Sequence, residues 1–192
     1  MTDFFRFPHT PHIAWLASGA PRDDKVLSPD EAAELLEGEV VIEEKLDGAN
    51  LGLSVSPDGV LRAQNRGQYL AQPFHGQFAR LTPWLAVHED RLFDALGAHL
   101  IAFGEWCAAQ HSLDYAALPD WWLVFDVYDR TTGRFWSTAR RNIWAAHLGW
   151  REVVLCFLNF ESYRSTPPGL QKPSAHRHSR SLPYCCLASL CR

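Results

Sequence analysis

The stretch VVIEEKLDGANLGL, residues 40–53, decides how the rest of the chain is interpreted, because it joins an apolar run to a lysine and a glycine turn. The apolar run at 40–42 predicts a strand. Strand alternation then places Glu43, Lys45 and Asp47 on one face. A lysine between carboxylates, next to a turn, is a candidate nucleophile.

Gly48 is expected to end that strand with a tight bend that brings the backbone near a ligand, and alternating apolar residues resume a strand at 51–55. A lysine amine attacks only when it is neutral. An isolated KxDG motif more often contains a solvated lysine, here paired to Glu43 or Glu44, because motifs this short recur by chance. Other parts of the chain have to decide between the two interpretations.

Length and composition favour one globular domain. The chain has 192 residues, of which 47% are hydrophobic and 21% charged. A net charge of -4 and an isoelectric point near 6.1 argue against binding nucleic acid through bulk charge. Neither a signal peptide nor an 18-residue apolar run is visible, so we expect a cytoplasmic protein without a membrane partner.

The composition changes near Trp150. All eight tryptophans lie at or before this residue, whereas four of the five cysteines lie after it. The sequence loses its periodicity after about Phe160, which is typical of disordered segments. We therefore expect a core at 1–155 and a disordered or non-native tail at 156–192. Its cysteines lack the spacing of a metal site.

Short strands interleaved with a few helices predict an α+β domain with antiparallel sheets. A capping box at Ser28 opens the first helix, and Gly38 is expected to end it. Turn and cap signals place the later elements. They are a hairpin around 56–59, a helix from about 82 to Gly97, strands at 100–107 and 121–130, and a helix from Ser137 or Thr138 to Gly149.

Further polar residues in apolar strands are candidates for a site. Glu105 shares a strand face with large apolar residues, and Asp126 lies inside an aromatic strand, so each needs a partner. Arg62, Gln64 and Arg66 share one face of the predicted hairpin. That arrangement suits an anion, and a solvated outer face of a sheet explains it equally well.

The order of these motifs resembles the covalent nucleotidyltransferases. EKLDGAN, NRG, FGEW and FDVYD are similar to their successive nucleotidyl-transfer motifs. The TPH arm, the QHSLDYAALP loop and STARR resemble the ATP-dependent RNA ligase branch. The resemblance covers about Phe4 to Trp150. It implies an antiparallel-sheet adenylation domain of the ligase and capping-enzyme type, here incomplete at the C-terminus.

The resemblance also implies a reaction and a set of site residues. Lys45 would attack the α-phosphate of ATP with Mg²⁺ or Mn²⁺, and the AMP would pass to an RNA 5′-phosphate that a 3′-hydroxyl then attacks. Arg66 would hold ribose or phosphate, Glu105 the ribose hydroxyls, and Phe125 the adenine. The remaining nucleotide-binding candidates are Glu43, Glu44, Asp47, Gly48, Asn50 and Asp126.

Two assignments stay open in the sequence. The pleat places Asp126 and Phe125 on opposite faces, so one acts indirectly or the strand bulges there. For the adenine-contacting glutamate, the family pattern favours Glu44, whereas strand alternation favours Glu43.

The C-terminal end departs from the family pattern. Neither a strand with a metal-binding glutamate nor a KxK strand is visible, and no metal ligand is identified. Loss of both would impair phosphoryl transfer severely. Two alternatives to an active ligase follow: a crippled nucleotide- or RNA-binding remnant, and a DNA ligase or capping-type transferase. The absence of a recognisable OB domain counts against the last.

Overall fold

The computed structural model describes residues 4–15, 25–37, 40–43, 45–111, 115, 118–150 and 155–156. The chain forms two compact units. The larger unit comprises Met1–Pro8, Leu46–Val153 and Cys191–Arg192, and the smaller comprises His9–Lys45 and Val154–Leu190. None of the helices in the described ranges is both long enough and apolar enough to span a membrane.

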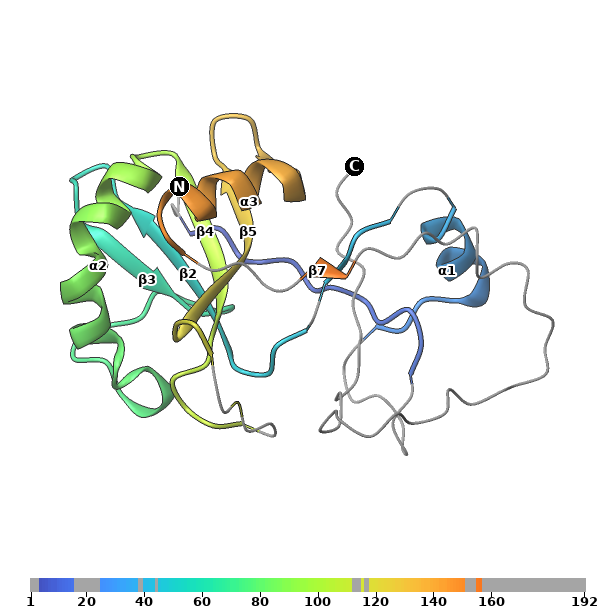
Figure 1. Ribbon diagram of the computed structural model, residues 1–192, viewed down its shortest axis with the longest axis horizontal. Coiled ribbons are helices and arrows are strands. Elements are labelled where there is room, and N and C mark those ends of the chain that lie inside the picture. The colour runs from blue at the N-terminus through green and yellow to red at the C-terminus, as the bar shows by residue number, and fades with distance from the viewer. Residues whose placement is uncertain are drawn as a thin grey trace. The chain divides into compact units, whose positions relative to one another are not determined.

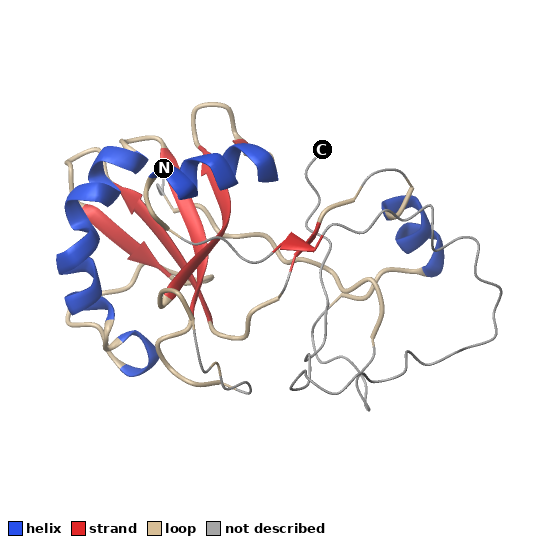
Figure 2. Ribbon diagram, in the orientation of Figure 1, coloured by secondary structure: helices blue, strands red, loops and turns tan. Residues whose placement is uncertain are grey.

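The larger unit is built on a five-stranded antiparallel sheet with the order β3-β2-β4-β5-β6 (Figures 1 and 2). Glycines with positive φ occupy two of its turns, Gly59 at 73° and Gly133 at 66°, a region that side chains disfavour. The α+β antiparallel fold expected from the sequence is therefore correct. The strands are β2 Ala49–Val55, β3 Leu61–Gln64, β4 Leu100–Trp106, β5 Trp122–Asp129 and β6 Arg134–Phe135.

Two α-helices and a short 3-10 helix, η1 (Gly76–Phe78), accompany the sheet. Helix α2 (Leu81–Leu96) ends at Gly97, which has a φ of 51°. Helix α3 (Thr138–His147) begins after Ser137, whose side chain accepts a hydrogen bond from the backbone N–H of Arg140. Both helices start and stop close to the signals in the sequence.

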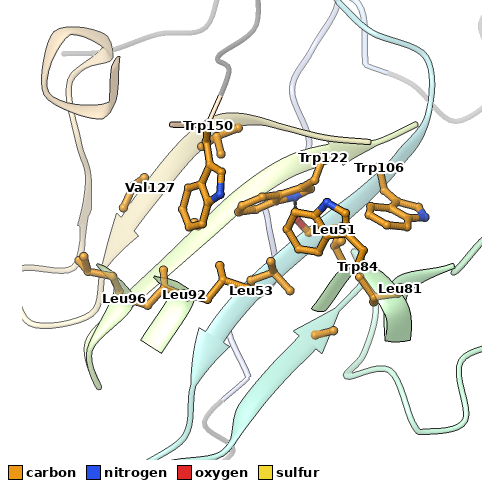
Figure 3. Close-up of a cluster of buried hydrophobic side chains, with 14 of the residues drawn as sticks. Leu51, Leu53, Leu81, Trp84, Leu92, Leu96, Trp106, Trp122, Val127 and Trp150 are labelled. Atoms are coloured by element: carbon orange, nitrogen blue, oxygen red, sulfur yellow. Dashed lines mark hydrogen bonds between the residues drawn. The ribbon is translucent and has the colours of Figure 1, made fainter. Parts of the chain in front are cut away.

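One face of the sheet packs on these helices and contains most of the hydrophobic core (Figure 3). Trp122 is fully buried there, and its indole N–H donates to the carbonyl of Leu51 at 3.2 Å. Each buried apolar side chain contributes about 1.5–3 kcal/mol. The core therefore stabilises the sheet on the face that carries the helices. The candidate site residues Asn50 and Glu105 lie on the opposite face.

The N-terminal arm covers part of the opposite face. Phe7 packs with Ile101 and Phe103, and the ring of Phe5 stacks on Tyr128 at 3.7 Å between centroids. The carbonyl of Phe5 accepts a hydrogen bond from Gln64 Nε2 at 2.8 Å. Phe5 and Phe7 of the predicted arm thus pack on the larger unit, as expected, whereas residues 9–15 belong to the smaller unit.

The smaller unit contains helix α1 (Pro29–Leu35) and a two-stranded sheet of β1 (Ile42–Glu43) and β7 (Leu155–Cys156). The capping box at Ser28 and Glu31 forms as predicted. Strand β1 ends at Glu43 and does not continue through Lys45, contrary to the expected alternation. The expected stop at Gly38 and residues 157–192 of the predicted tail (156–192) lie outside the described residues, whereas Cys156 belongs to β7.

Candidate functional site

The segment after Lys45 is fixed to the larger unit by backbone hydrogen bonds. Leu46 is buried beside Leu123. The N–H of Asp47 donates to the hydroxyl of Tyr115 at 2.7 Å, and the N–H of Gly48 donates to Glu105 Oε1 at 3.0 Å. Glu105 therefore holds the glycine of the KLDG motif directly. A carboxylate bond of this kind is stronger than one between neutral groups.

Gly48 is required by a close approach of the backbone. A Cβ there would lie 2.5 Å from the carbonyl oxygen of Trp106 and 3.0 Å from Cys107 Sγ. A backbone carbonyl cannot move aside without disturbing β4. The sequence predicted that Gly48 brings the backbone near a ligand, and the close neighbour in this structure is the end of β4.

Asn50 and Glu105 are directly opposite each other in the β2–β4 pair, so their side chains share the face away from the helices. Asn50 Oδ1 is buried and finds no hydrogen-bond partner in the described part of the chain. A buried amide oxygen without a partner costs about 1–3 kcal/mol. A bound hydroxyl or amino group would remove that cost.

Strand β5 contains a bulge at Phe125, next to Asp126. A regular pleat would place these two candidate residues on opposite faces of the sheet. The register passes from Gly104↔Val124 to Phe103↔Asp126 and leaves Phe125 as the extra residue. Asp126 therefore shares the face of Phe103. The ring of Phe125 packs on that face as well, because it contacts the clusters around Phe103 and Leu123. The bulge resolves the conflict that the pleat alone poses.

Cys107 carries a partly buried thiol that lies close to two carboxylates. Burial raises the pKa of its thiol to about 12, with further increases from Glu105 and Asp47. The thiol is therefore neutral at physiological pH. The same negative field would favour a ligand that carries hydrogen-bond donors, such as ribose hydroxyls, at this end of the sheet.

Three described candidates remain: Arg66 in the larger unit, and Lys45 and Glu43 in the smaller unit. Arg66 is exposed in a turn in which Asn65 Oδ1 accepts from the N–H groups of Gly67 and Gln68, each at 2.9 Å. Lys45 is exposed and Glu43 is 7% exposed, and both belong to the smaller unit. Glu44 lies outside the described residues, so the choice between the two glutamates stays open.

Sequence reasoning missed three residues next to the candidates: Tyr115 and Cys107, described above, and Arg141, whose Nη1 donates to the carbonyl of Phe125. Tyr115 lies in the QHSLDYAALP loop and Arg141 in STARR, two segments noted only for their family resemblance. Cys107 follows the FGEW motif. A tyrosine in a polar loop and an arginine in a helix carry no sequence signal for hydrogen bonds across the fold, so only the structure identifies their contacts.

The described residues contain no group of three or more His, Cys, Asp or Glu side chains placed to hold a metal ion. Mg²⁺ is commonly bound by one or two carboxylates together with substrate phosphates and water. The nearby carboxylates Asp47 and Glu105 are of the right chemical type for such a shared site. The phosphates would have to supply the remaining oxygens.

A family model described as RNA ligase matches residues 38–175, more than half of the chain. No curated protein matches this chain. Among solved structures, an RNA ligase of Naegleria gruberi, as a lysine-to-methionine mutant with AMP and Mn, is 17% identical at a TM-score of 0.51. The match covers 65% of this chain and 38% of that one.

An aspartate-to-alanine mutant of the Naegleria gruberi enzyme without ligand gives a TM-score of 0.50 at 17% identity, again covering 65% of this chain and 38% of that one. An archaeal ATP-dependent RNA ligase is 22% identical at a TM-score of 0.49, covering 64% of this chain and 32% of its own. The chain therefore spans less than half the length of the structures it matches. The two matches at 0.50 and above support the same fold.

Proposed function

Because the chain belongs to the RNA ligase family, whose model matches residues 38–175, we propose that it forms a covalent lysyl-AMP on Lys45 and transfers the AMP to the 5′-phosphate of RNA. In the first step the neutral Nζ of Lys45 bonds to the α-phosphorus of ATP. The bond to the bridging oxygen breaks, pyrophosphate leaves, and the amine loses a proton.

In the second step an oxygen of the RNA 5′-phosphate attacks the same phosphorus, and the phosphorus–nitrogen bond to Lys45 breaks. A 3′-hydroxyl then attacks the activated 5′-phosphate and releases AMP. Each step builds negative charge on phosphoryl oxygens, which cations must offset. Mg²⁺ or Mn²⁺ held by ATP phosphates and the carboxylates near Gly48 would supply that charge.

The observation that carries the proposal is the hydrogen bond from the N–H of Gly48 to Glu105 Oε1, at 3.0 Å. It holds the segment three residues after Lys45 against the strand that contributes Glu105. The unpartnered Oδ1 of Asn50 lies opposite on β2. Together these groups offer acceptors to the hydroxyls and amino groups of a nucleotide.

The remaining roles follow the same chemistry. Glu105 accepts from ribose hydroxyls, and the ring of Phe125 stacks on adenine. Arg66 binds ribose or phosphate through its guanidinium fork. Asp126 orients the nucleotide from the bulge, and Glu43 or Glu44 contacts the base. The remaining nucleotide-binding residues are Asp47, Gly48 and Asn50.

Division into a core at 1–155 and a separate tail at 156–192 remains part of the proposal, as does action in the cytoplasm. A nucleotide-binding remnant without transfer activity is the alternative, and a DNA ligase or capping-type transferase is a third. Transfer of AMP to the 5′-phosphate of RNA is expected only of the RNA ligase, so this reaction distinguishes the three functions.

The test is transfer of AMP from α-labelled ATP to a nicked or single-stranded RNA. RNA with a 5′-phosphate and a blocked 3′-hydroxyl should take up label in the presence of Mg²⁺ or Mn²⁺, because no 3′-hydroxyl can then release the AMP, and RNA with a 5′-hydroxyl should not. Lys45→Ala should abolish transfer, whereas Lys25→Ala should leave it intact. ATP binding without transfer would instead identify the remnant. Transfer of AMP to 5′-phosphorylated DNA in preference to RNA, or transfer of GMP from α-labelled GTP to a 5′-diphosphate RNA end, would contradict the proposal.

A further inference from the structure

Arg141 is a buried cation on α3 whose guanidinium reaches the bulge in β5. The residue is 2% exposed. Its Nη1 donates to the carbonyl of Phe125, and its Nε and Nη2 donate to Asn142 Oδ1 at 2.9 and 2.7 Å. A buried guanidinium is costly unless it is well hydrogen-bonded. This one directs one of its donors to a single backbone oxygen in a neighbouring element.

That oxygen belongs to the extra residue of the bulge. The register of the β4–β5 pair skips Phe125, and an extra residue of this kind loses its regular place in the ladder. Its carbonyl therefore needs another donor. Arg141 supplies one, and so fixes the orientation of the peptide group from which the ring of Phe125 projects.

A second contact fixes the ring itself. Phe7, from the N-terminal arm, packs edge-on against Phe125 at 5.3 Å between ring centroids. Phe125 is only half-buried, so part of the ring remains available to a ligand. Without a fixed backbone, a half-buried ring can turn with its peptide group. The hydrogen bond from Arg141 limits that rotation.

We infer that Arg141 is a positioning residue for the nucleotide: through the carbonyl of Phe125 it holds the aromatic ring on the face of the sheet that displays Glu105. This inference rests on the proposed function, in which Phe125 stacks on adenine. In this role Arg141 acts through the backbone of Phe125 and not by contact with the base or the phosphates. Its effect should therefore be confined to ligands that contain the base.

The neighbouring arginine offers a matched control. Arg140 is exposed on the same helix, and its guanidinium lies 3.9 Å from the ring centroid of Trp136. Arg140→Met and Arg141→Met remove the same charge from adjacent positions of α3. Only the second removes a donor to the bulge. Overall charge and helix propensity are therefore matched between the two variants.

The experiment measures binding of ATP and of inorganic tripolyphosphate by calorimetry, at one Mg²⁺ concentration. Arg141→Met should weaken ATP binding about tenfold and leave tripolyphosphate within about twofold. Arg141→Lys, which keeps the positive charge and an N–H donor for the carbonyl of Phe125, should recover part of the loss. Arg140→Met should change neither ligand by more than about twofold.

A double-mutant cycle with Phe125→Ala tests whether Arg141 acts through the ring. Once the ring is gone, Arg141→Met should weaken ATP binding by no more than about a further twofold. Independent effects that multiply in the double mutant would overturn the inference, and so would an equal loss of tripolyphosphate binding. If Arg141→Met does not fold, Arg141→Lys carries the same comparisons.

The outcomes also separate this inference from the proposed function. If Phe125→Ala weakens ATP binding and Arg141→Met does not, only the role of Arg141 is wrong. If the unaltered chain binds no ATP, or Phe125→Ala has no effect on ATP binding, the nucleotide site and the role of Arg141 are both wrong.

Discussion

Gly104→Ala should destabilise the larger unit, because β4 has no room for a side chain at this position. A Cβ there would overlap the indole nitrogen of Trp122 and lie 2.7 Å from the carbonyl oxygen of Leu123. Carbon–oxygen contacts this short force a shift in the structure. One of the two neighbours is backbone, and the other is a fully buried indole.

The loss of stability in Gly104→Ala depends on how firmly the Trp122 side chain is held in place. Trp122 donates its indole N–H to the carbonyl of Leu51 and packs edge-on against Trp84 at 5.7 Å and Trp150 at 5.4 Å. Overpacking a core of this kind costs about 1–3 kcal/mol. Weakening the indole hydrogen bond costs about 1 kcal/mol more. We expect a total loss of about 2–4 kcal/mol in the free energy of unfolding.

Urea unfolding followed by tryptophan fluorescence measures this loss. With a slope of about 2 kcal/mol per molar urea, the midpoint should fall by about 1–2 M. Gly67→Ala is the matched control, because a Cβ there would meet only Asn65 Oδ1, at 3.7 Å. That variant should change the free energy of unfolding by less than about 0.5 kcal/mol.

The reasoning also makes the effect of Gly104→Ala depend on Trp122. In a Trp122→Phe background the indole nitrogen is absent, so the alanine should cost less than it does in the unaltered chain. Equal stability of Gly104→Ala and Gly67→Ala would refute the packing argument. So would an undiminished cost in the Trp122→Phe background.

Three further predictions concern titrating groups. Burial lowers the pKa of His88 below 6.5, Asp120 opposes the shift and Arg91 adds to it. The free energy of unfolding should therefore fall as the pH drops from about 6.5 through the lower pKa of the folded state. His88→Asn should reduce that fall in a series of urea titrations, and an unchanged pH profile would contradict the prediction. The thiol of Cys107, with its pKa near 12, should resist alkylation at pH 8 while the chain is folded, and a double substitution of Glu105→Gln and Asp47→Asn should accelerate it in peptide mapping. The pKa of Glu31 lies below 4.5, chiefly because the backbone N–H of Ser28 donates to its carboxylate and, to a smaller extent, because of the Ser28 side chain and Lys25. The contribution of Glu31 to stability is therefore present above pH 4.5 and is lost as the pH falls through the pKa of the folded state. NMR titration should show an upward shift of the Glu31 midpoint in Ser28→Ala, and an unmoved midpoint would count against the capping box.

Local signals in the sequence predicted most of the elements, because caps and turns act over a few residues. Ser28, Gly97 and Ser137 mark helix boundaries that the structure confirms. The extent of β1 was wrong, because alternation was extended through Lys45, whereas the strand ends at Glu43. Periodicity cannot show where a strand loses its pairing partner.

The candidate site was predictable only in part. Glu105 was identified as an acid that needed a partner, and its bond to the N–H of Gly48 is such a partner. The sequence could pose the conflict between Phe125 and Asp126 but could not resolve it, because a bulge depends on the register of two strands. The buried donor Arg141 comes from a helix distant in sequence, and no local pattern marks it.

The most direct test of the account is to map the AMP adduct after incubation with ATP and Mg²⁺ or Mn²⁺. The chain contains three lysines, Lys25, Lys45 and Lys172, so peptide mass spectrometry can distinguish every candidate amine. The account predicts one acid-labile AMP, attached to the peptide that contains Lys45. An adduct on Lys25 or Lys172, or an adduct that persists in Lys45→Ala, would contradict it.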